Sequence, residues 1–415
     1  MGKGRCLLIA PDVTGTVVRI QQGTAVTRDG VPAADGTASL CDGVLKSDDG
    51  SVLDWLLDRQ AVPGIPGFSA FLQPIADQWR ETLLRALFYL AGKQEVALPV
   101  LWLYPRNLPA LAHLSHDTDG NELSQANRLL EVLDMARMNS TWCVIPPGYP
   151  AELIAAIRRA GHELAMHYDA VSEGTVWSEE GFDNQWRQLV NLFGGERPLT
   201  NKNHYLRWEG DTEFFAWCAE RGIQLDESKG VSKTGAAGFN FGTCHPYFPV
   251  DPNDRMIDVL ELPTPTQDLV VFAPEEFAEQ LLAVVLRHHG VLHLLFHPAH
   301  IEKPGVADAL LNAVEKAKAQ RLEWWTARQI SAWERARRAV RWSNYAPTQD
   351  GVSVHVRVGD ELPEVSIMWL TMPDVRVRVS GKVHKPQRVE RWGFLFQSVT
   401  FDAERDSEYT LEITC

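Results

Sequence analysis

Two acids and two histidines lie close together in the run 113–120, His-Leu-Ser-His-Asp-Thr-Asp-Gly, where an apolar segment gives way to a predicted helix. If the run ends a strand at Asp117, alternation puts Ser115 and Asp117 on one face and His116 on the other. Asp119 then follows in the turn. Two carboxylates at this spacing can have different roles, one as general base and one as metal ligand. The alternative is a plain turn, because Asp-Gly and Asp-Thr-Asp commonly precede a helix that needs an N-cap.

Histidines follow three further predicted strands of the same region. His167 ends one strand, His204 lies in the next polar segment, and His297 closes the last strand before a proline. Because active-site residues of barrel enzymes gather at the carboxyl ends of the strands, we expect these histidines to meet Asp117 and Asp119. A single strand-end histidine is more often structural. The prediction of one shared site therefore depends on all these strand ends together.

Other histidines carry different expectations. His162 lies in a helix-to-strand turn, where a structural role is the favoured interpretation. His293 shares a strand face with His297 but lies deeper, so we expect a hydrogen-bonded core residue. His245 precedes a proline, and it is either a loop residue or a substrate contact.

The elements that must position these residues alternate between strands and helices from about 106 to 342. Apolar positions at spacings of three and four predict the helices, and short apolar runs predict the strands. Such alternation implies a parallel sheet, and the polar strand ends favour a barrel with its site at the carboxyl ends of the strands. The predicted strands cover 114–117, 141–145, 163–167, 199–205, 223–226 and 291–297, and the predicted helices 122–138, 150–161, 183–193, 211–221, 274–289, 306–319 and 326–342.

Two regions flank this central one. Residues 1–105 are expected to form a small α/β unit without an evident site, which is either a decayed domain or the surface of a homodimer. Residues 343–415 contain short β-strand patterns separated by Asp-Gly and Ser-Gly turns, and they predict a small β-sandwich. The expected fold class is therefore α/β, with a barrel between an N-terminal α/β unit and a C-terminal β-sandwich.

Composition excludes several classes of function. The chain has 415 residues, of which 45% are hydrophobic and 23% charged, as in ordinary globular proteins. Its net charge of -14 argues against nucleic acid as a partner. The six cysteines contain no Cys-x-x-Cys pair, which favours reduced thiols. The first apolar run is too short for a signal peptide or a membrane span, so the expected location is the cytoplasm, without membrane attachment.

At these residues the sequence resembles the polysaccharide deacetylase family (NodB homology). Metal-dependent members of that family remove acetyl groups from N-acetylated sugars on a distorted (β/α)7 barrel, which is the barrel type that the resemblance implies here. The resemblance covers about 106–320. It rests on 115–120 as the first motif with one residue inserted between the acids, on 161–163 with His167 as the second, on 202–205 as the third, on 260–263 as the fourth and on 295–297 as the fifth.

The resemblance implies a role for each site residue. Asp117 would be the general base, and Asp119 and His167 would be metal ligands. His297 would assist the leaving group or line the acetate pocket. The expected cofactor is a divalent metal, with zinc as the first choice, whose bound water has a lowered pKa.

The sequence departs from the family pattern at two positions. Val171 stands where the family places a second histidine, and Lys202 replaces an arginine. A mononuclear zinc site needs three protein ligands and an open position for water, so a third ligand must come from elsewhere. His204 is the candidate, and Asp169 and His116 are weaker options.

The expected function is metal-dependent hydrolysis that removes acetyl groups from N-acetylated or O-acetylated saccharides. The expected substrate-binding residues are Lys202, Tyr205, Arg207, Trp208 and His245. One alternative is a metal-independent amidohydrolase for a small C–N substrate, similar to the allantoinases that also lack the histidine pair. The other is a catalytically degenerate carbohydrate-binding protein with the β-rich tail as its recognition module.

Overall fold

The computed structural model describes residues 5–30, 43–233, 235–348 and 351–414. It divides into two compact units. The barrel unit comprises 13–78 and 110–331, and the sandwich unit comprises 1–12, 79–109 and 332–415. This division differs from the expected boundary near residue 105, because residues 13–78 group with the barrel and residues 79–109 with the sandwich.

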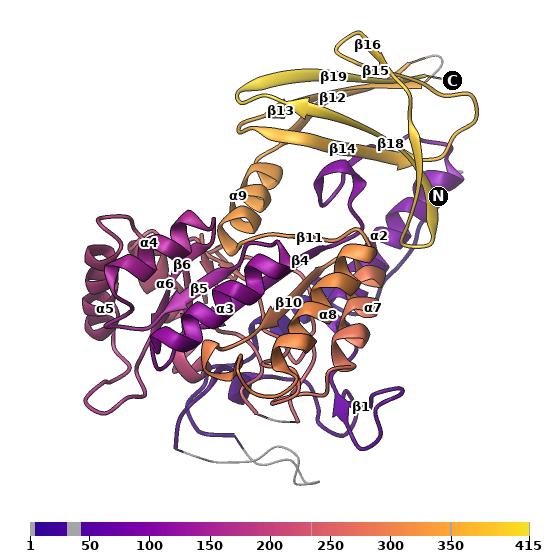
Figure 1. Ribbon diagram of the computed structural model, residues 1–415. Coiled ribbons are helices and arrows are strands. Elements are labelled where there is room, and N and C mark those ends of the chain that lie inside the picture. Colours follow the sequence, from indigo (N-terminus) through magenta and orange to yellow (C-terminus); the bar gives the residue numbers. More distant parts are fainter. Residues whose placement is uncertain (1–4, 31–42, 234, 349–350, 415) are drawn as a thin grey trace. The chain divides into compact units, whose positions relative to one another are not determined.

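The barrel unit is built on one curled sheet of parallel strands in the order β10-β4-β5-β6-β7-β8-β9, with β11 also pairing β4 (Figure 1). The longer strands are buried along their whole length, as expected where helices cover a parallel sheet. The ladders described do not join β9 to β10, so the barrel is open there. The strands are β4 Leu111–Asp117, β5 Thr141–Val144, β6 Glu163–Tyr168, β7 Thr200–Asn203, β8 Leu225–Asp226, β9 Leu260–Glu261, β10 Val291–Leu295 and β11 Glu323–Trp324.

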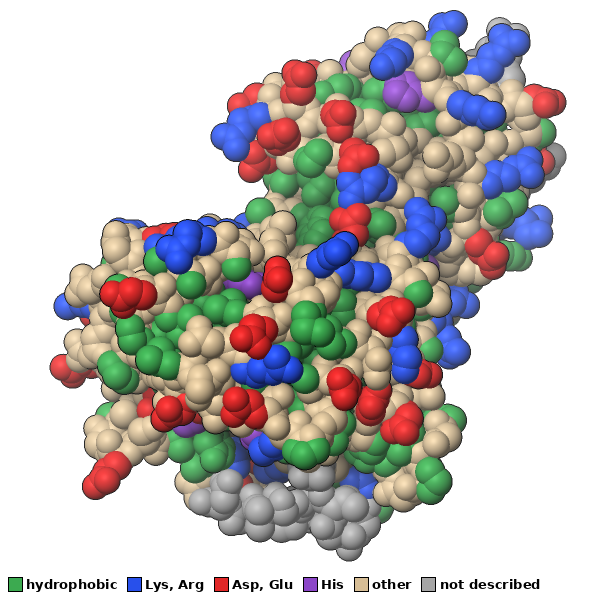
Figure 2. Space-filling model, viewed as in Figure 1, with side chains coloured by type: hydrophobic (Ala, Val, Ile, Leu, Met, Phe, Trp, Pro, Cys, Tyr) green, Lys and Arg blue, Asp and Glu red, His purple; other side chains and the backbone are tan. Residues whose placement is uncertain are grey.

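Amphipathic helices cover the outside of this sheet, and Figure 1 shows α3 and α8 side by side on it. In α8 the buried positions Leu310, Val314 and Ala317 recur at spacings of three and four, which turns one face toward the strands. Figure 2 shows acidic and basic side chains interspersed over the exposed faces of these helices. The helices are α3 Leu123–Ala136, α4 Ala151–Arg159, α5 Glu179–Leu192, α6 Glu213–Glu220, α7 Phe277–His288 and α8 Val306–Ala319.

Residues 13–78 are part of the barrel unit and not of an independent N-terminal domain. They contain α1 Val13–Gln22, η1 Ser47–Gly50, β1 Gln60–Ala61, β2 Ser69–Ala70 and the start of α2 Ile75–Lys93. Their backbone bonds with the barrel loops: Val26 pairs with Gly210, and Phe71 N donates to Ala237 O at 2.8 Å. The short predicted elements in this region did not reveal these long-range bonds.

The sandwich unit contains two antiparallel sheets, as the C-terminal strand patterns predicted. One has the order β12-β13-β19-β15-β16 and the other β17-β18-β14-β3. Alternate residues of β13 are buried, which is the expected pattern for a sheet with one covered face. The strands are β3 Val100–Leu101, β12 Arg341–Thr348, β13 Gly351–Val358, β14 Leu362–Leu370, β15 Arg376–Val379, β16 Lys382–His384, β17 Gln387–Arg391, β18 Phe394–Ala403 and β19 Ser407–Thr414.

The sandwich also recruits residues from before the barrel, which the sequence boundaries missed. β3 pairs with β14, although the two strands lie far apart in the sequence. The unit further contains η2 Pro105–Asn107 and most of α9 Ala327–Arg338. Within the described ranges, no helix has both the length and the apolar character needed to cross a membrane.

Candidate metal and catalytic site

The structure brings the five strand-end residues of the sequence analysis together. Asp117 is the last residue of β4, Asp119 follows it, and His167 lies in β6. His204 comes directly after β7, and His297 is the second residue after β10. Because these strands run parallel, their carboxyl ends share one edge of the sheet. The edge carries a pocket of about 270 Å³ lined by Asp117, Asp119, His204, Tyr205, Leu206, Ser232, Gln267, His297, Ala299 and His300.

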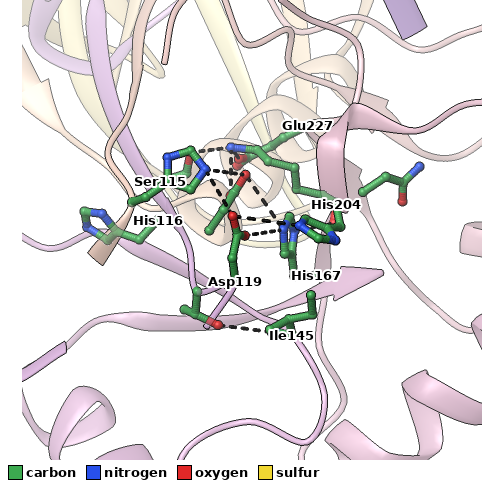
Figure 3. Close-up of polar contacts among 12 residues, drawn as sticks. Ser115, His116, Asp119, Ile145, His167, His204 and Glu227 are labelled. Carbon is green, nitrogen blue, oxygen red and sulfur yellow. Dashed lines mark hydrogen bonds and ion pairs between the residues drawn. The ribbon is translucent and has the colours of Figure 1, made fainter. Parts of the chain in front are cut away.

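Asp119, His167 and His204 form a group that could hold a metal ion, because one donor atom from each lies within 4.8 Å of the others. Asp119 Oδ1 is 3.2 Å from His167 Nε2, and Asp119 Oδ2 is 3.8 Å from His204 Nε2 (Figure 3). Burial raises the pKa of Asp119, but the hydrogen bond from His167 and the nearby histidine charges outweigh it and lower that pKa. Its carboxylate is therefore ionised, as a metal ligand must be.

His167, His204 and His297 share one arrangement of their rings. Each donates from Nδ1 to a fixed oxygen, which orients the ring and leaves Nε2 facing Asp119. Such second partners orient metal-binding histidines and raise their basicity. The acceptors are the carbonyl of Lys202 for His167 at 2.9 Å, Asp169 Oδ1 for His204 at 3.0 Å and Asp268 Oδ2 for His297 at 2.5 Å.

His297 is arranged to hold a proton. Its Nε2 lies 4.0 Å from Asp117 Oδ2 and 3.8 Å from Asp119 Oδ2. Burial lowers the pKa of His297, but the charge and hydrogen bond of Asp268, with smaller contributions from Asp117 and Asp119, raise it to about 9. The ring is therefore an imidazolium at neutral pH, beside the carboxylates at the pocket.

Asp268 is a site residue that the sequence analysis missed. It also accepts from the backbone N of His297 at 2.8 Å, and His300 Nδ1 lies 3.0 Å from its Oδ2. The expected fourth motif, 260–263, instead includes Glu261, a buried carboxyl bonded to Lys229 N. The carboxylate that orients His297 comes a few residues later, and its only sequence signal is an acid at the end of the Pro-Thr-Pro-Thr-Gln run.

Lys202, which was expected to bind substrate, contacts Asp117 and is not among the residues that line the pocket. Its side chain is fully buried, with Nζ 3.5 Å from Asp117 Oδ1. Nζ donates to Ser115 Oγ at 2.6 Å and lies 3.1 Å from Glu227 Oε2. Burial lowers the pKa of Lys202, but Asp117 and Glu227 outweigh burial and raise it. Asp117 Oδ1 is buried and faces the Lys202 ammonium, whereas Oδ2 lies 4.0 Å from His297 Nε2.

Glu227, directly after β8, is a second residue that the sequence analysis missed. Its Oε1 is 2.8 Å from His113 Nε2, and His293 Nε2 is 3.5 Å from its Oε2. Burial raises the pKa of Glu227, but the charges of Lys202 and the two histidines outweigh burial and lower it. His293 also bonds Ser115 Oγ at 2.9 Å, which confirms the expected hydrogen-bonded core histidine. The strand before Glu227 is only two residues long, so its register was not readable from the sequence.

Two of the expected substrate contacts do not reach the pocket. Trp208 is fully buried, with Lys229 Nζ 3.9 Å from its ring centroid, so it cannot stack on a sugar. His245 is buried and its Nε2 bonds His288 O at 2.8 Å. Its neighbour Cys244 bonds Val291, the first residue of β10, which places His245 at the opposite edge of the sheet.

The other two expected contacts lie at the pocket or next to it. Tyr205 lines the pocket and is 55% exposed, with φ of 58°. Non-glycine residues adopt this left-handed conformation at a cost, which often marks a functional site. Arg207 is directed away from the pocket, because its guanidinium bonds Ala170 O and Glu209.

The weaker candidates for a third metal ligand have other partners. His116 Nδ1 bonds Phe296 O at 2.8 Å, and burial lowers the pKa of His116 to about 3. Figure 3 shows its ring apart from Asp119 and His167. Asp169 accepts from the backbone of Val171 and from His204, so it supports His204 instead of replacing it.

No family model matches the sequence, and no curated protein matches it. Among solved structures, one assigned as a polysaccharide deacetylase from Mycobacterium smegmatis is 19% identical with a TM-score of 0.44, over 61% of this chain and 99% of that chain. A family 4 acetyl xylan esterase from Clostridium thermocellum in complex with cobalt is 16% identical with a TM-score of 0.31, over 54% and 90%. A mutant of a family 4 pseudoenzyme with restored activity is 14% identical with a TM-score of 0.34, over 55% and 69%.

The solved structures to which the chain is similar are thus named as a deacetylase, an esterase and a variant of a pseudoenzyme. The parallel barrel agrees with the fold that the motifs implied.

Proposed function

We propose that this chain is a metal-dependent hydrolase that removes acetyl groups from acetylated saccharides. The observation that supports this most directly is the convergence of Asp119, His167 and His204 beside Asp117 and His297 at one pocket. One carboxylate and two imidazoles form a donor set that suits zinc and similar divalent metals, and three protein ligands leave a position for water. In this proposal, His204 supplies the third ligand, because Val171 stands where the family places its second histidine.

The chain's own residues would supply the proton transfers. Asp117, held by Lys202, takes the proton of the attacking water as the new C–O bond forms on the acyl carbon. His297, held as a cation by Asp268, gives its proton to the leaving nitrogen or oxygen as the acyl bond breaks. The products are acetate and the deacetylated sugar. A bound divalent metal would lower the pKa of the water and polarise the acyl oxygen.

The test combines metal content with acetate release. Protein purified without chelator is expected to contain close to one divalent metal per chain and to release acetate from N-acetylated oligosaccharides. His167→Ala removes one donor and is expected to lose both properties. The matched control is His355→Ala, which removes a histidine of the sandwich unit that pairs with Glu408. Full activity in metal-free protein would reject the metal-dependent reaction.

A metal-independent amidohydrolase is the second candidate. It is favoured by Val171 and by the direct hydrogen bond between His167 Nε2 and Asp119 Oδ1, which satisfies both groups without an ion. The same experiment separates the two candidates, because this one predicts turnover of a small C–N substrate after chelation.

A further inference from the structure

The N-terminal segment 45–49 lies behind a loop that lines the pocket. Trp208 N donates to Leu45 O at 3.1 Å, and Lys46 forms an isolated antiparallel bridge with Arg207. Arg207 and Trp208 directly follow the part of the β7 loop that lines the pocket. The segment is therefore fixed to that wall.

The same segment is also fixed to the loop after β8. Gly230 N donates to Ser47 Oγ at 3.2 Å. Ser232, which lines the pocket, donates to Asp48 from its backbone N at 3.1 Å and from its Oγ at 2.7 Å. Segment 45–49 thus joins two loops that lie on the same side of the pocket.

Burial makes this connection firm. Ser47 and the side chain of Asp49 are fully buried, and Asp49 pairs with Lys233. Asp49 also accepts from the backbone N of Lys46 and of Gly30, both at 2.8 Å. Breaking these bonds would leave buried polar atoms without partners, which is costly. The segment is therefore a fixed wall.

We propose that segment 45–49 closes one side of the pocket and limits the substrate to a single acetylated sugar residue, either free or at the end of a chain. The inference rests on the proposed function and adds its substrate class. A polymer bound along its length needs a groove that is open at both sides. Here segment 45–49 lies behind two of the loops that line the pocket. The pocket volume of about 270 Å³ is at the small end of ligand sites, which span roughly 300–1,000 Å³.

The experiment measures acetate release, with divalent metal present, from N-acetylglucosamine, its β-linked oligomers of increasing length and the long polymer. We expect kcat/KM per chain to change less than about threefold from the shortest substrate that is turned over to the longer oligomers, because the added residues lie outside the pocket. Acetate should come from chain ends, which the position of the first deacetylated residue reports.

Two variants test the wall itself. Lys233→Ala and Asp48→Ala each weaken the attachment of segment 45–49, and we expect either to raise the rate on the long polymer several-fold relative to the monomer. Lys316→Ala breaks an exposed ion pair with Glu279 elsewhere on the barrel unit and is the matched control. Lys233→Ala is the milder change and remains informative where Asp48→Ala fails to fold.

The outcomes separate this inference from the proposed function. If kcat/KM rises about tenfold or more with chain length, or if acetate is released from internal residues, segment 45–49 does not limit the substrate. The proposed hydrolase activity would stand. An unchanged ratio of the polymer rate to the monomer rate in both variants would also show that segment 45–49 does not limit the substrate. The absence of acetate from every substrate rejects the proposed hydrolase, and the substrate class fails with it.

Discussion

Histidines lie at both edges of the barrel sheet, but they have different partners at each edge. At the carboxyl edge, His167, His204 and His297 donate from Nδ1 and turn Nε2 toward carboxylates. At the amino edge, His162 accepts the backbone N–H of Ser140 with its Nδ1 at 3.1 Å. Burial lowers the pKa of His162 to about 4, so this ring is neutral. Residue type alone therefore does not identify a site; the partner of each ring nitrogen does.

The amino edge also holds a group with metal-ligand chemistry, formed by Asp77, Cys244 and His245. All three are buried, and Asp77 accepts from Thr243 Oγ1 and from the backbone N of Cys244, both at 2.8 Å. These atoms already satisfy one another within the protein. The carboxyl edge instead opens to a pocket, and we expect metal and chemistry only there.

The largest effect is expected at Asp117. Asp117→Asn removes the base and leaves the Lys202 ammonium without one of its carboxylate partners. Because general-base catalysis contributes about 10²–10⁴-fold, kcat should fall by roughly 10³-fold. Metal content should stay near that of the wild-type protein, since Asp117 is not a proposed ligand. A variant within about threefold of wild-type kcat would show that the base lies elsewhere.

A matched pair of substitutions tests the comparison of the two edges directly. His204→Gln and His245→Gln make the same change, one at each edge. We expect His204→Gln to weaken metal binding by at least about 10–100-fold, the range seen even for supporting residues. His245→Gln should keep the metal. The measurement is metal stoichiometry after dialysis against a weak competitor, and metal loss in His245→Gln alone would move the site to the amino edge.

The next prediction concerns the proton on His297. Its pKa is raised to about 9, so the ring holds its proton below that pH and loses it above. Asp268→Asn removes the charge that raises this pKa, and the alkaline limb of the kcat profile should move to lower pH. Activity near neutral pH should fall while KM changes little. An unmoved alkaline limb would show that His297 is not the acid.

The smallest effect is expected at His162. Between pH 6.5 and about 4 the unfolded chain binds a proton here and the folded chain does not. Stability should therefore decrease as the pH falls through this window, by up to about 1.4 kcal/mol per pH unit from this residue. His162→Gln removes that contribution. Urea unfolding at several pH values measures it, and equal slopes in both proteins would contradict the assignment.

Sequence patterns were sufficient to predict the alternating elements and the meeting of Asp117, Asp119, His167, His204 and His297. They succeeded because Asp117, His167 and His297 end largely apolar runs, where strand ends are readable, and because His204 lies in the polar segment that follows in the same alternation. The same reasoning missed Glu227 and Asp268. Strands β8 and β9 are two residues long and are followed by irregular loops, so local periodicity gives no register there.

Burial by distant segments explains the remaining differences. Trp208 and His245 looked accessible in sequence, but Leu45 bonds the backbone of Trp208, and Asp77 bonds the backbone of the residue before His245. The division into two compact units differs from the expected domain boundaries for the same reason. Pairing of β3 with β14 is set by complementary strand edges that no local pattern records.

The pairing of β3 with β14 has a consequence for folding during synthesis and for truncated chains. Strand β3 leaves the ribosome well before β14, and the whole stretch 110–331 is synthesised between them. Residues 110–331 of the barrel unit are thus inserted between two parts of the sandwich unit, and the sandwich cannot close until β14 has been synthesised. A truncated chain that stops before residue 362 would leave β3 as an orphan edge open to aggregation.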